Sequence, residues 1–261
     1  MRARSLLIFL FGLTCVGLTC AIDIATQDSI RFGAFYMVPI TFVAWREGRV
    51  AGIVVALFAS ACYAYANSPF DKMLVANSAL EYGIYLSNAV VIGLLRVRFH
   101  ESRWLANHDT VTGSLNQRAF DRSANAILSN IGSPGIGMAF LDADHFKQVN
   151  DTHGHQKGTD VLIRIAECIQ EHVAPGCTVA RYGGDEFVIM QNGITKEEWV
   201  ALVRRIVADV ARTMKTDGLP VTLSAGATHI VRSASLEELM HECDLLMYRA
   251  KSQGRNRVES D

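Results

Sequence analysis

The sequence predicts a chain of two parts, an all-α membrane region followed by an α/β domain whose central mixed sheet is flanked by helices. Half of the 261 residues are hydrophobic and the mean hydropathy is +0.18, which is high for a soluble protein. The apolar excess lies before residue 97, whereas helix-like and strand-like stretches alternate after residue 109. A Gly-Gly pair between two strand-like stretches marks a hairpin in the second part.

Four apolar stretches in the first part are each near the length that a bilayer requires. They run over residues 5–22, 29–45, 50–65 and 80–95. The first resembles a signal peptide, but no cleavage site of small residues separates it from the others, so we interpret it as a retained span. A buried helical core of a soluble protein is the alternative, and the confinement of charges mainly to the gaps disfavours it.

Basic residues orient these spans. They occur at the N-terminus, in the second gap and after the fourth stretch, at Arg2, Arg4, Arg46, Arg49, Arg96, Arg98 and Arg103. Around the other two gaps the only basic residues are Arg31 and Lys72. Because positive charge stays on the cytoplasmic side, we expect a multi-pass protein of the bacterial inner membrane with everything after Arg96 in the cytoplasm.

The expected segments are a membrane sensor or anchor region (1–96), a helical linker (97–108) and a cytoplasmic domain (109–261). The linker either pairs with its copy in a dimer or is a plain connector, and so few residues do not distinguish the two. The six cysteines lack metal-type spacing and are predicted to be small buried hydrophobic residues. A net charge of -1 gives no sign of a nucleic-acid binder.

The cytoplasmic domain is expected to alternate helices and strands. We predict helices over 116–130, 157–173, 195–215 and 236–252, and strands over 135–141, 177–182, 187–191 and 221–230. This order implies a mixed sheet covered by helices, and its length fits one domain.

Two acidic segments are the candidate chemistry of this domain. Gly183-Gly184-Asp185-Glu186-Phe187 lies at the hairpin, where glycine reaches positive φ and bare backbone admits a bulky ligand. Asp142 is expected where the first strand ends. Carboxylates from a strand end and a hairpin tip can meet at one sheet edge, which suits Mg²⁺ and metal-assisted phosphoryl or nucleotidyl transfer. Taken singly, each acid is also explained as a solvated loop residue.

Two further observations near Asp142 leave alternatives open. Lys147 is placed to neutralise phosphate, or is a solvated lysine. His145, His153 and His155 suggest zinc, but the last two flank a loop glycine and no cysteine or helical histidine spacing supports such a site.

Six segments occur in the order of one family's motifs: 109–118, 142–151, 154–155, 181–187, 224–226 and 244–256. Together they resemble the GGDEF family of membrane-tethered diguanylate cyclases over about residues 108–258. The resemblance implies a nucleotidyl-cyclase-like fold and a homodimer that holds one GTP on each subunit. Each 3′-hydroxyl attacks the other nucleotide's α-phosphate, giving cyclic di-GMP and pyrophosphate, with Mg²⁺ or Mn²⁺ as the cofactor.

The resemblance also implies residue roles. Asp142 and Asp185 resemble the metal-binding carboxylates, with help from the carbonyl of Ala143, and Asp185 or Glu186 would assist the attacking hydroxyl. The substrate-binding positions are His145, Phe146, Lys147, Asn150, Thr159, Gly183, Gly184, Lys251 and Arg255. Lys251 alone is equally explained as a charge that complements a helix dipole.

Two positions depart from the family. Thr159 stands where the family usually has an aspartate that accepts from guanine, and Asp160 lies about 100° further round the helix. A hydroxyl is also a donor, so we expect guanine selection to weaken by about 1.5–3 kcal/mol and some ATP to be used, giving cyclic GMP-AMP. The family's inhibitory Arg-x-x-Asp corresponds to residues 174–177, which carry no charge, so no inhibitory site is predicted there.

A degenerate domain that serves as a nucleotide receptor or a dimerisation module is the rival interpretation. The intact acidic and basic positions of the motifs favour activity, and Thr159 is the one feature that favours degeneration.

Overall fold

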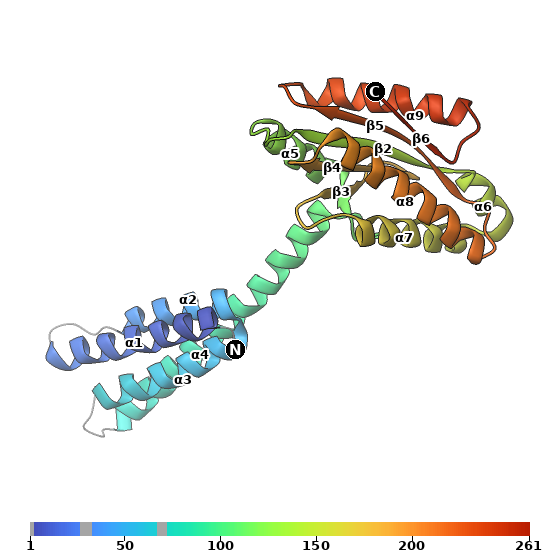
Figure 1. Cartoon of the computed structure of the whole chain (residues 1–261). Coiled ribbons are helices and arrows are strands. Elements are labelled where there is room, and N and C mark those ends of the chain that lie inside the picture. The colour runs from blue at the N-terminus through green and yellow to red at the C-terminus, as the bar shows by residue number, and fades with distance from the viewer. Residues whose placement is uncertain (1–2, 27–32, 67–71) are drawn as a thin grey trace. The chain divides into compact units, whose positions relative to one another are not determined.

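The computed structural model describes residues 3–26, 33–66 and 72–261, and it divides into two compact units. These units comprise residues 1–103 and 104–261, and each is described by itself (Figure 1).

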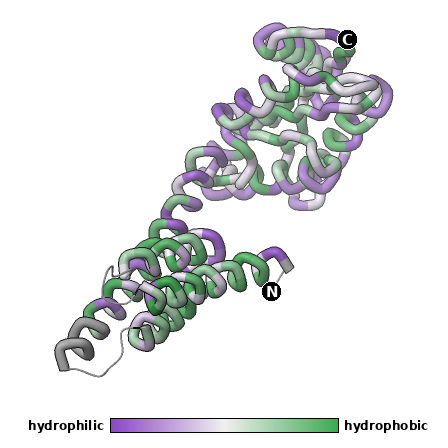
Figure 2. The backbone as a smooth tube through the Cα atoms, turned by 90° about the vertical axis from the view of Figure 1, so that its left-hand side faces the viewer, coloured by the Kyte–Doolittle hydropathy of each residue, from purple (hydrophilic) through white to green (hydrophobic). Residues whose placement is uncertain are grey.

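The first unit is all-helical. Its elements are α1 (Ala3–Ala25), the 3-10 turn η1 (Gly33–Tyr36), α2 (Met37–Glu47), α3 (Arg49–Ala66) and the first part of α4 (Lys72–Asn107). Hydrophobic residues run along these helices (Figure 2), and many large apolar side chains on them are exposed, which is the pattern of a surface that faces lipid.

The predicted number of four spans is not confirmed. Within the described ranges, three helical segments are long and apolar enough to cross a membrane: Arg4–Ala25, Arg49–Ala66 and Ala79–Asn107. The predicted stretch 29–45 begins at residues 29–32, outside the described residues. Its remainder forms η1 and α2, and the eleven residues of α2 rise only about 16 Å. Gly48, with φ 99°, caps α2 and lets the chain turn directly into α3.

The second unit is an α/β domain around a six-stranded mixed sheet, as predicted. The strand order is β1-β3-β4-β2-β5-β6, in which the central pairs are antiparallel and the outer pairs β1·β3 and β5·β6 are parallel. The strands are β1 (Leu115–Asn116), β2 (Ile136–Asp144), β3 (Thr178–Arg181), β4 (Glu186–Asn192), β5 (Thr222–Ile230) and β6 (Arg257–Ser260).

Five helices cover both faces of this sheet (Figure 1). They are α5 (Gln117–Leu128), α6 (Phe146–His153), α7 (His155–His172), α8 (Lys196–Thr216) and α9 (Leu236–Ser252). Alternation along β2 sends Ala139 and Leu141 into the core beneath α7 and α8, and Met138 and Phe140 into the core beneath α5 and α9. Asp142 therefore belongs to the α5–α9 face.

Capping residues begin the two helices whose predicted limits agree best with the structure. Thr195 caps α8 and Ser235 caps α9, and in each a glutamate three residues later completes a capping box. Three of the six cysteines are buried as predicted (Cys20, Cys168 and Cys243), the other three are half-buried, and all six are free thiols.

Candidate active site

β3 and β4 form the predicted hairpin, whose tip is fixed from two sides. Across the tip, the Arg181 guanidinium donates from Nη2 and Nε to the Gly184 carbonyl at 2.6 and 3.1 Å. Below it, the backbone N–H of Ala143 donates to the Asp185 carbonyl at 3.1 Å. The second bond joins the hairpin tip directly to β2, so the two acidic segments lie side by side.

The two tip glycines have a different role from the one predicted. Neither Gly183 nor Gly184 has a positive φ, so the expectation that the turn requires left-handed backbone is wrong. A Cβ on Gly183 would instead collide with the Glu186 carboxylate, whereas a Cβ on Gly184 would meet open space. Gly183 thus makes room for a neighbouring acid, and Gly184 leaves the exposed tip bare.

Asp142 lies within β2 rather than at its end. It pairs with Glu186 on one side and with Ser224 on the other, and β2 runs two residues further because its pairing with β5 continues to Asp144 and Thr222. The Asp142 side chain is only 12% exposed, and Lys251 Nζ lies 2.8 Å from its Oδ2. The structure therefore brings together Asp142, Lys251 and the hairpin.

Asp144 is a buried acid that the sequence reasoning did not assign. Its carboxylate accepts from the hydroxyls of Thr222 and Ser224 at 2.7 and 2.8 Å and from the Asn256 N–H at 3.2 Å. Arg255 Nε lies 3.9 Å away. Asp144 thereby positions the turn after α9, which carries the predicted phosphate contact Arg255. Asp144 follows Asp142 by two residues, and alternate residues of a strand share one face of the sheet. This spacing could have indicated that Asp144 lies beside the site.

The carboxylates of this edge influence one another. Burial raises the pKa of Asp142, Lys251 opposes that rise, and Asp185 and Asp144 add to it. Burial also raises the pKa of Glu186, followed by the nearby charges of Asp142 and Asp185. Crowded, half-buried carboxylates favour a bound cation.

The donor set at this edge suits Mg²⁺. The predicted ligands are the side chains of Asp142 and Asp185 and the carbonyl of Ala143, all oxygen atoms. The described residues contain no cluster of three or more histidine, cysteine or acidic side chains arranged to hold a metal, and Mg²⁺ requires only one or two carboxylates. His153 and His155 are exposed at the ends of α6 and α7.

α6 begins directly after β2 and offers backbone donors. His145 caps it in the left-handed region at φ 62°, and Phe146 is its first residue. The N–H groups of a first helical turn have no partner within the helix, which makes this end suitable for phosphate. Lys147 is exposed on the same turn. The three predicted phosphate contacts at 145–147 therefore share one helix start.

Asn150 of α6 packs against the turn of α7 that carries Thr159. A Cβ on Gly158 would collide with Asn150 Oδ1 and lie 3.2 Å from the Phe146 ring, so Asn150 packs directly over Gly158. Thr159 is the next residue and is half-buried, whereas Asp160 is exposed. This placement agrees with a shared role for Asn150 and Thr159 in binding a base.

The ion pair between Asp109 and Arg181, next to the hairpin, was also not predicted from the sequence. Arg181 Nη1 lies 3.1 Å from both carboxylate oxygens of Asp109, and Asp109 accepts from the N–H and hydroxyl of Thr112 at 2.8 Å. Burial alone would raise the pKa of Asp109, but the bonds from Thr112 and Arg181 outweigh it and lower that pKa. The first residues after α4 are thus bonded to the residue that holds the tip.

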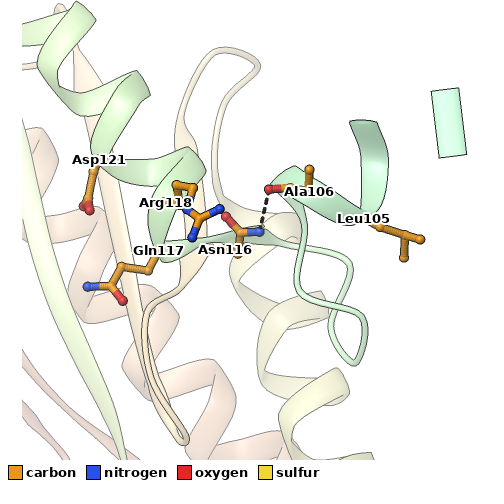
Figure 3. Close-up of a pocket in the computed structure, with 6 residues that line it drawn as sticks. All are labelled: Leu105, Ala106, Asn116, Gln117, Arg118 and Asp121. Atoms are coloured by element: carbon orange, nitrogen blue, oxygen red, sulfur yellow. Dashed lines mark hydrogen bonds between the residues drawn. The ribbon is translucent and has the colours of Figure 1, made fainter. Parts of the chain in front are cut away.

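A cavity of about 540 Å³ lies apart from these residues, between the end of α4 and the start of α5 (Figure 3). Its lining residues are Leu105, Ala106, Asn116, Gln117, Arg118 and Asp121. Asn116 Nδ2 donates to the Ala106 carbonyl at 3.0 Å, and Asn116 Oδ1 caps α5. None of the predicted site residues lines this cavity.

The fold and the site define a class, an α/β domain whose mixed sheet brings two acidic segments together at one edge. The family described as "Diguanylate cyclase, GGDEF domain" matches residues 106–257. This chain belongs to the GGDEF family.

Named relatives match this chain over different shares of its length. Diguanylate cyclase DgcM of Escherichia coli (strain K12) is 35% identical over 164 residues, which are 59% of this chain and 38% of that protein. The cyclic di-GMP phosphodiesterase NbdA of Pseudomonas aeruginosa is 30% identical over 90% of this chain but only 28% of its own length. The chain thus spans well under half of these relatives.

A solved structure extends the likeness. The coiled coil and GGDEF domain of DgcB from Caulobacter crescentus, crystallised with c-di-GMP, superposes with a TM-score of 0.62 at 30% identity. It covers 70% of this chain and all of the DgcB chain.

Proposed function

We propose that this chain is a diguanylate cyclase that condenses two GTP molecules into cyclic di-GMP and pyrophosphate. The observation that carries the proposal is the meeting of Asp142 and Asp185 at one sheet edge, with Lys251 on the first and the start of α6 beside both. A nucleotide triphosphate offers the charge and shape that this edge accommodates.

The proposed roles of the site residues are metal binding, phosphate binding and proton transfer. Asp142, Asp185 and the Ala143 carbonyl would hold Mg²⁺ or Mn²⁺, which polarises the phosphate when bound. The first amides of α6, with Lys147, Lys251 and Arg255, hold the phosphate oxygens. Glu186, whose pKa is raised by burial and by its acidic neighbours, is suited to accept the proton of the attacking 3′-hydroxyl.

Two copies are required because each domain holds one nucleotide. The linker part of α4 supports a homodimer: Val97, Phe99, Trp104 and Leu105 are 45–55% exposed on a helix that runs unbroken to Asn107. Phe99 already packs on the Trp45 ring of α2, and the exposed apolar surface of the other three side chains is typical of a surface that another helix covers.

We further propose an inner-membrane location, with residues 1–96 as a sensor or anchor, 97–108 as the linker and 109–261 as the cytoplasmic cyclase domain. Three apolar helices and the arginine distribution support this arrangement. A fourth span over residues 29–45 remains part of the proposal.

Thr159 supports a second, related activity, the use of some ATP to form cyclic GMP-AMP. It adjoins Gly158, on which Asn150 packs, and offers a hydroxyl where a carboxylate would select guanine. Residues 174–177 carry no charged side chain, so we propose that product does not inhibit through them.

The test is an incubation of the membrane-extracted protein with Mg²⁺ and GTP, with and without ATP, and identification of products by mass. We expect cyclic di-GMP and pyrophosphate, and none from Asp185→Ala. Nucleotide binding without any product from the unaltered protein would instead favour the receptor interpretation.

A further inference from the structure

An open groove of about 610 Å³ runs along α2 in the helical unit. The hydroxyl of Thr41 in its wall exchanges hydrogen bonds with Asn88 of α4, the shorter of them at 2.8 Å. An occupant therefore meets apolar and aromatic side chains along the groove and a positive charge, Arg46, at one end. The lining residues are Met37, Val38, Thr41, Phe42, Trp45 and Arg46.

Three arginines surround the charged end of this groove. Arg46 lies in the last turn of α2, and a Cβ on the capping Gly48 would lie 2.9 Å from Arg96 Nη1, so Arg96 of α4 lies over the turn that follows. Arg49 begins α3 and packs directly on Gly93 of α4. The groove thus ends at a basic cluster built from three helices.

No partner among the described residues accounts for these charges. None of the three guanidinium groups makes an ion pair or a side-chain hydrogen bond within that part of the chain, and Glu47 pairs with none of them. Arginine near the C-terminus of α2 also complements the helix dipole, which is the simplest alternative explanation. The dipole explains the sign of the charge but not the apolar groove that leads to it.

The length of the groove matches one leaflet of a bilayer. Met37 and Arg46 are nine residues apart on one helix, a rise of about 14 Å. The hydrocarbon core of a bilayer is about 30 Å thick, so one leaflet supplies about 15 Å. In the proposed orientation Arg46 lies at the cytoplasmic boundary, which is where the lipid phosphates of the inner leaflet lie.

We propose that this groove binds an anionic phospholipid of the inner leaflet, with one acyl chain along α2 and the phosphate at Arg46 and Arg96. The planar fork of arginine matches phosphate oxygens, and basic pockets on the cytoplasmic side of membrane proteins bind anionic headgroups. A zwitterionic lipid would bring its own cation to the same arginines, so the site should prefer an anionic headgroup. The inference rests on the proposed membrane location and not on the proposed reaction.

Trp45 connects the groove to the linker part of α4. Its ring lines the groove and also packs on Phe99, with ring centroids 5.6 Å apart. A lipid in the groove therefore contacts the residue that supports Phe99. Trp45 also provides a reporter, because brominated acyl chains quench the fluorescence of a tryptophan that they touch.

The test uses the full chain in phosphatidylcholine nanodiscs, with Trp104→Phe to remove the tryptophan of the linker. The remaining Trp199 is fully buried in the second unit and supplies a constant signal. A minor, fixed share of the lipid is replaced by brominated phosphatidylglycerol or by brominated phosphatidylcholine. We expect phosphatidylglycerol to quench Trp45 with an apparent affinity about fivefold or more above that of phosphatidylcholine, and Arg46→Gln to lower this preference about fivefold.

Arg98→Gln is the matched control for the loss of one positive charge. Its side chain is 83% exposed and pairs with Glu101, so the preference for phosphatidylglycerol should stay unchanged. Equal quenching by the two lipids would overturn the inference. An undiminished preference in Arg46→Gln would assign the effect to the general charge of the membrane surface and would overturn it as well. A chain that does not enter the discs would reject the proposed membrane location, and the inference with it, whereas absence of product formation would affect the cyclase proposal alone.

Discussion

Glu186 and Asp142 destabilise the nucleotide-free domain when ionised. In the folded domain their pKa values lie above the ordinary carboxyl value. The loss of folding stability is therefore absent below the ordinary pKa, where both states are protonated, and develops as pH rises through the raised pKa. The proposed function needs the ionised forms, because a protonated carboxyl group is a poor ligand for a divalent cation and cannot act as a base.

Glu186→Gln should therefore raise the melting temperature of the cyclase domain at pH 7 and lower product formation by about 100-fold or more. The gain in melting temperature should shrink towards zero as pH falls below about 4, where the native carboxyl is protonated too. Thermal unfolding of both proteins from pH 3.5 to 8 measures the sign of the change in melting temperature. A variant less stable at pH 7 would contradict the electrostatic account.

Gly183 and Gly184 provide a matched pair. Gly183→Ala forces the Glu186 carboxylate, the far end of a flexible side chain, to move away, so it should cost less than about 1 kcal/mol of unfolding free energy but lower product formation about tenfold or more. Gly184→Ala meets open space and should stay within about 0.5 kcal/mol. Urea unfolding followed through the buried Trp199 measures both. If Gly184→Ala keeps its stability but loses product, the ligand approaches the bare tip closely. An unchanged rate in Gly183→Ala would contradict the role of Gly183 in making room for the Glu186 carboxylate.

Thr159→Asp should sharpen the choice of base. A carboxylate accepts from both guanine N–H groups, so the share of cyclic GMP-AMP formed from equimolar GTP and ATP should fall about tenfold or more. Asp160→Asn is the control, because Asp160 is exposed on another side of α7. If the unaltered protein forms cyclic di-GMP and no cyclic GMP-AMP from the same mixture, the proposal that it uses ATP is wrong.

The meeting of the two acidic segments was predictable at the residue scale, because both flanked strands that were expected to share a sheet. Asp144 was missed because it is three residues past the expected end of this strand at residue 141, whereas β2 continues to Asp144. The Asp109–Arg181 pair joins positions 72 residues apart, and no local pattern indicates such a contact.

At the scale of elements, the hairpin depends on Arg181. One guanidinium bonds both Asp109, just after α4, and Gly184, which precedes the proposed metal ligand Asp185. The end of the linker and the tip of the hairpin therefore share one rigid connection, which makes Arg181 a positioning residue.

Arg181→Lys keeps the charge but cannot bond both partners, since a lysine lacks the planar fork. We expect the tip to lose about 1.5–3 kcal/mol of stabilisation. Faster hydrogen exchange at residues 182–185 and a lower rate of product formation would show this loss of stabilisation at the tip. Arg164→Lys, in an exposed ion pair with Glu167, should change neither. Unchanged exchange at the tip of Arg181→Lys would argue against this role.

Long elements with clear start signals were predicted well, as α8 and α9 show with their capping boxes. β1 and β6 were not, because strands of two and four residues carry no periodicity and form only where an edge strand is available. α6 was not predicted, because its eight residues are short and rich in polar side chains, although its start carries three of the proposed phosphate contacts.

At the scale of the whole molecule, composition predicted two unlike parts, and the structure shows a helical unit and an α/β unit. The number of spans was harder to predict, because hydropathy reports how apolar a stretch is and not whether its helix is continuous. Residues 33–45, the described part of the second stretch, lie in a 3-10 turn and the eleven-residue helix that follows it.

The central claim is that Asp142 and Asp185 form one divalent-metal site at which nucleotides condense. The most direct measurement is the rate of cyclic di-GMP formation from GTP as Mg²⁺ is titrated, for the unaltered chain, Asp142→Asn and Asp185→Asn. We expect a saturable Mg²⁺ dependence in the unaltered chain and a loss of about 100-fold or more in each variant at every Mg²⁺ concentration. Either variant reaching the unaltered rate at high Mg²⁺, or product formed without divalent metal, would contradict the account.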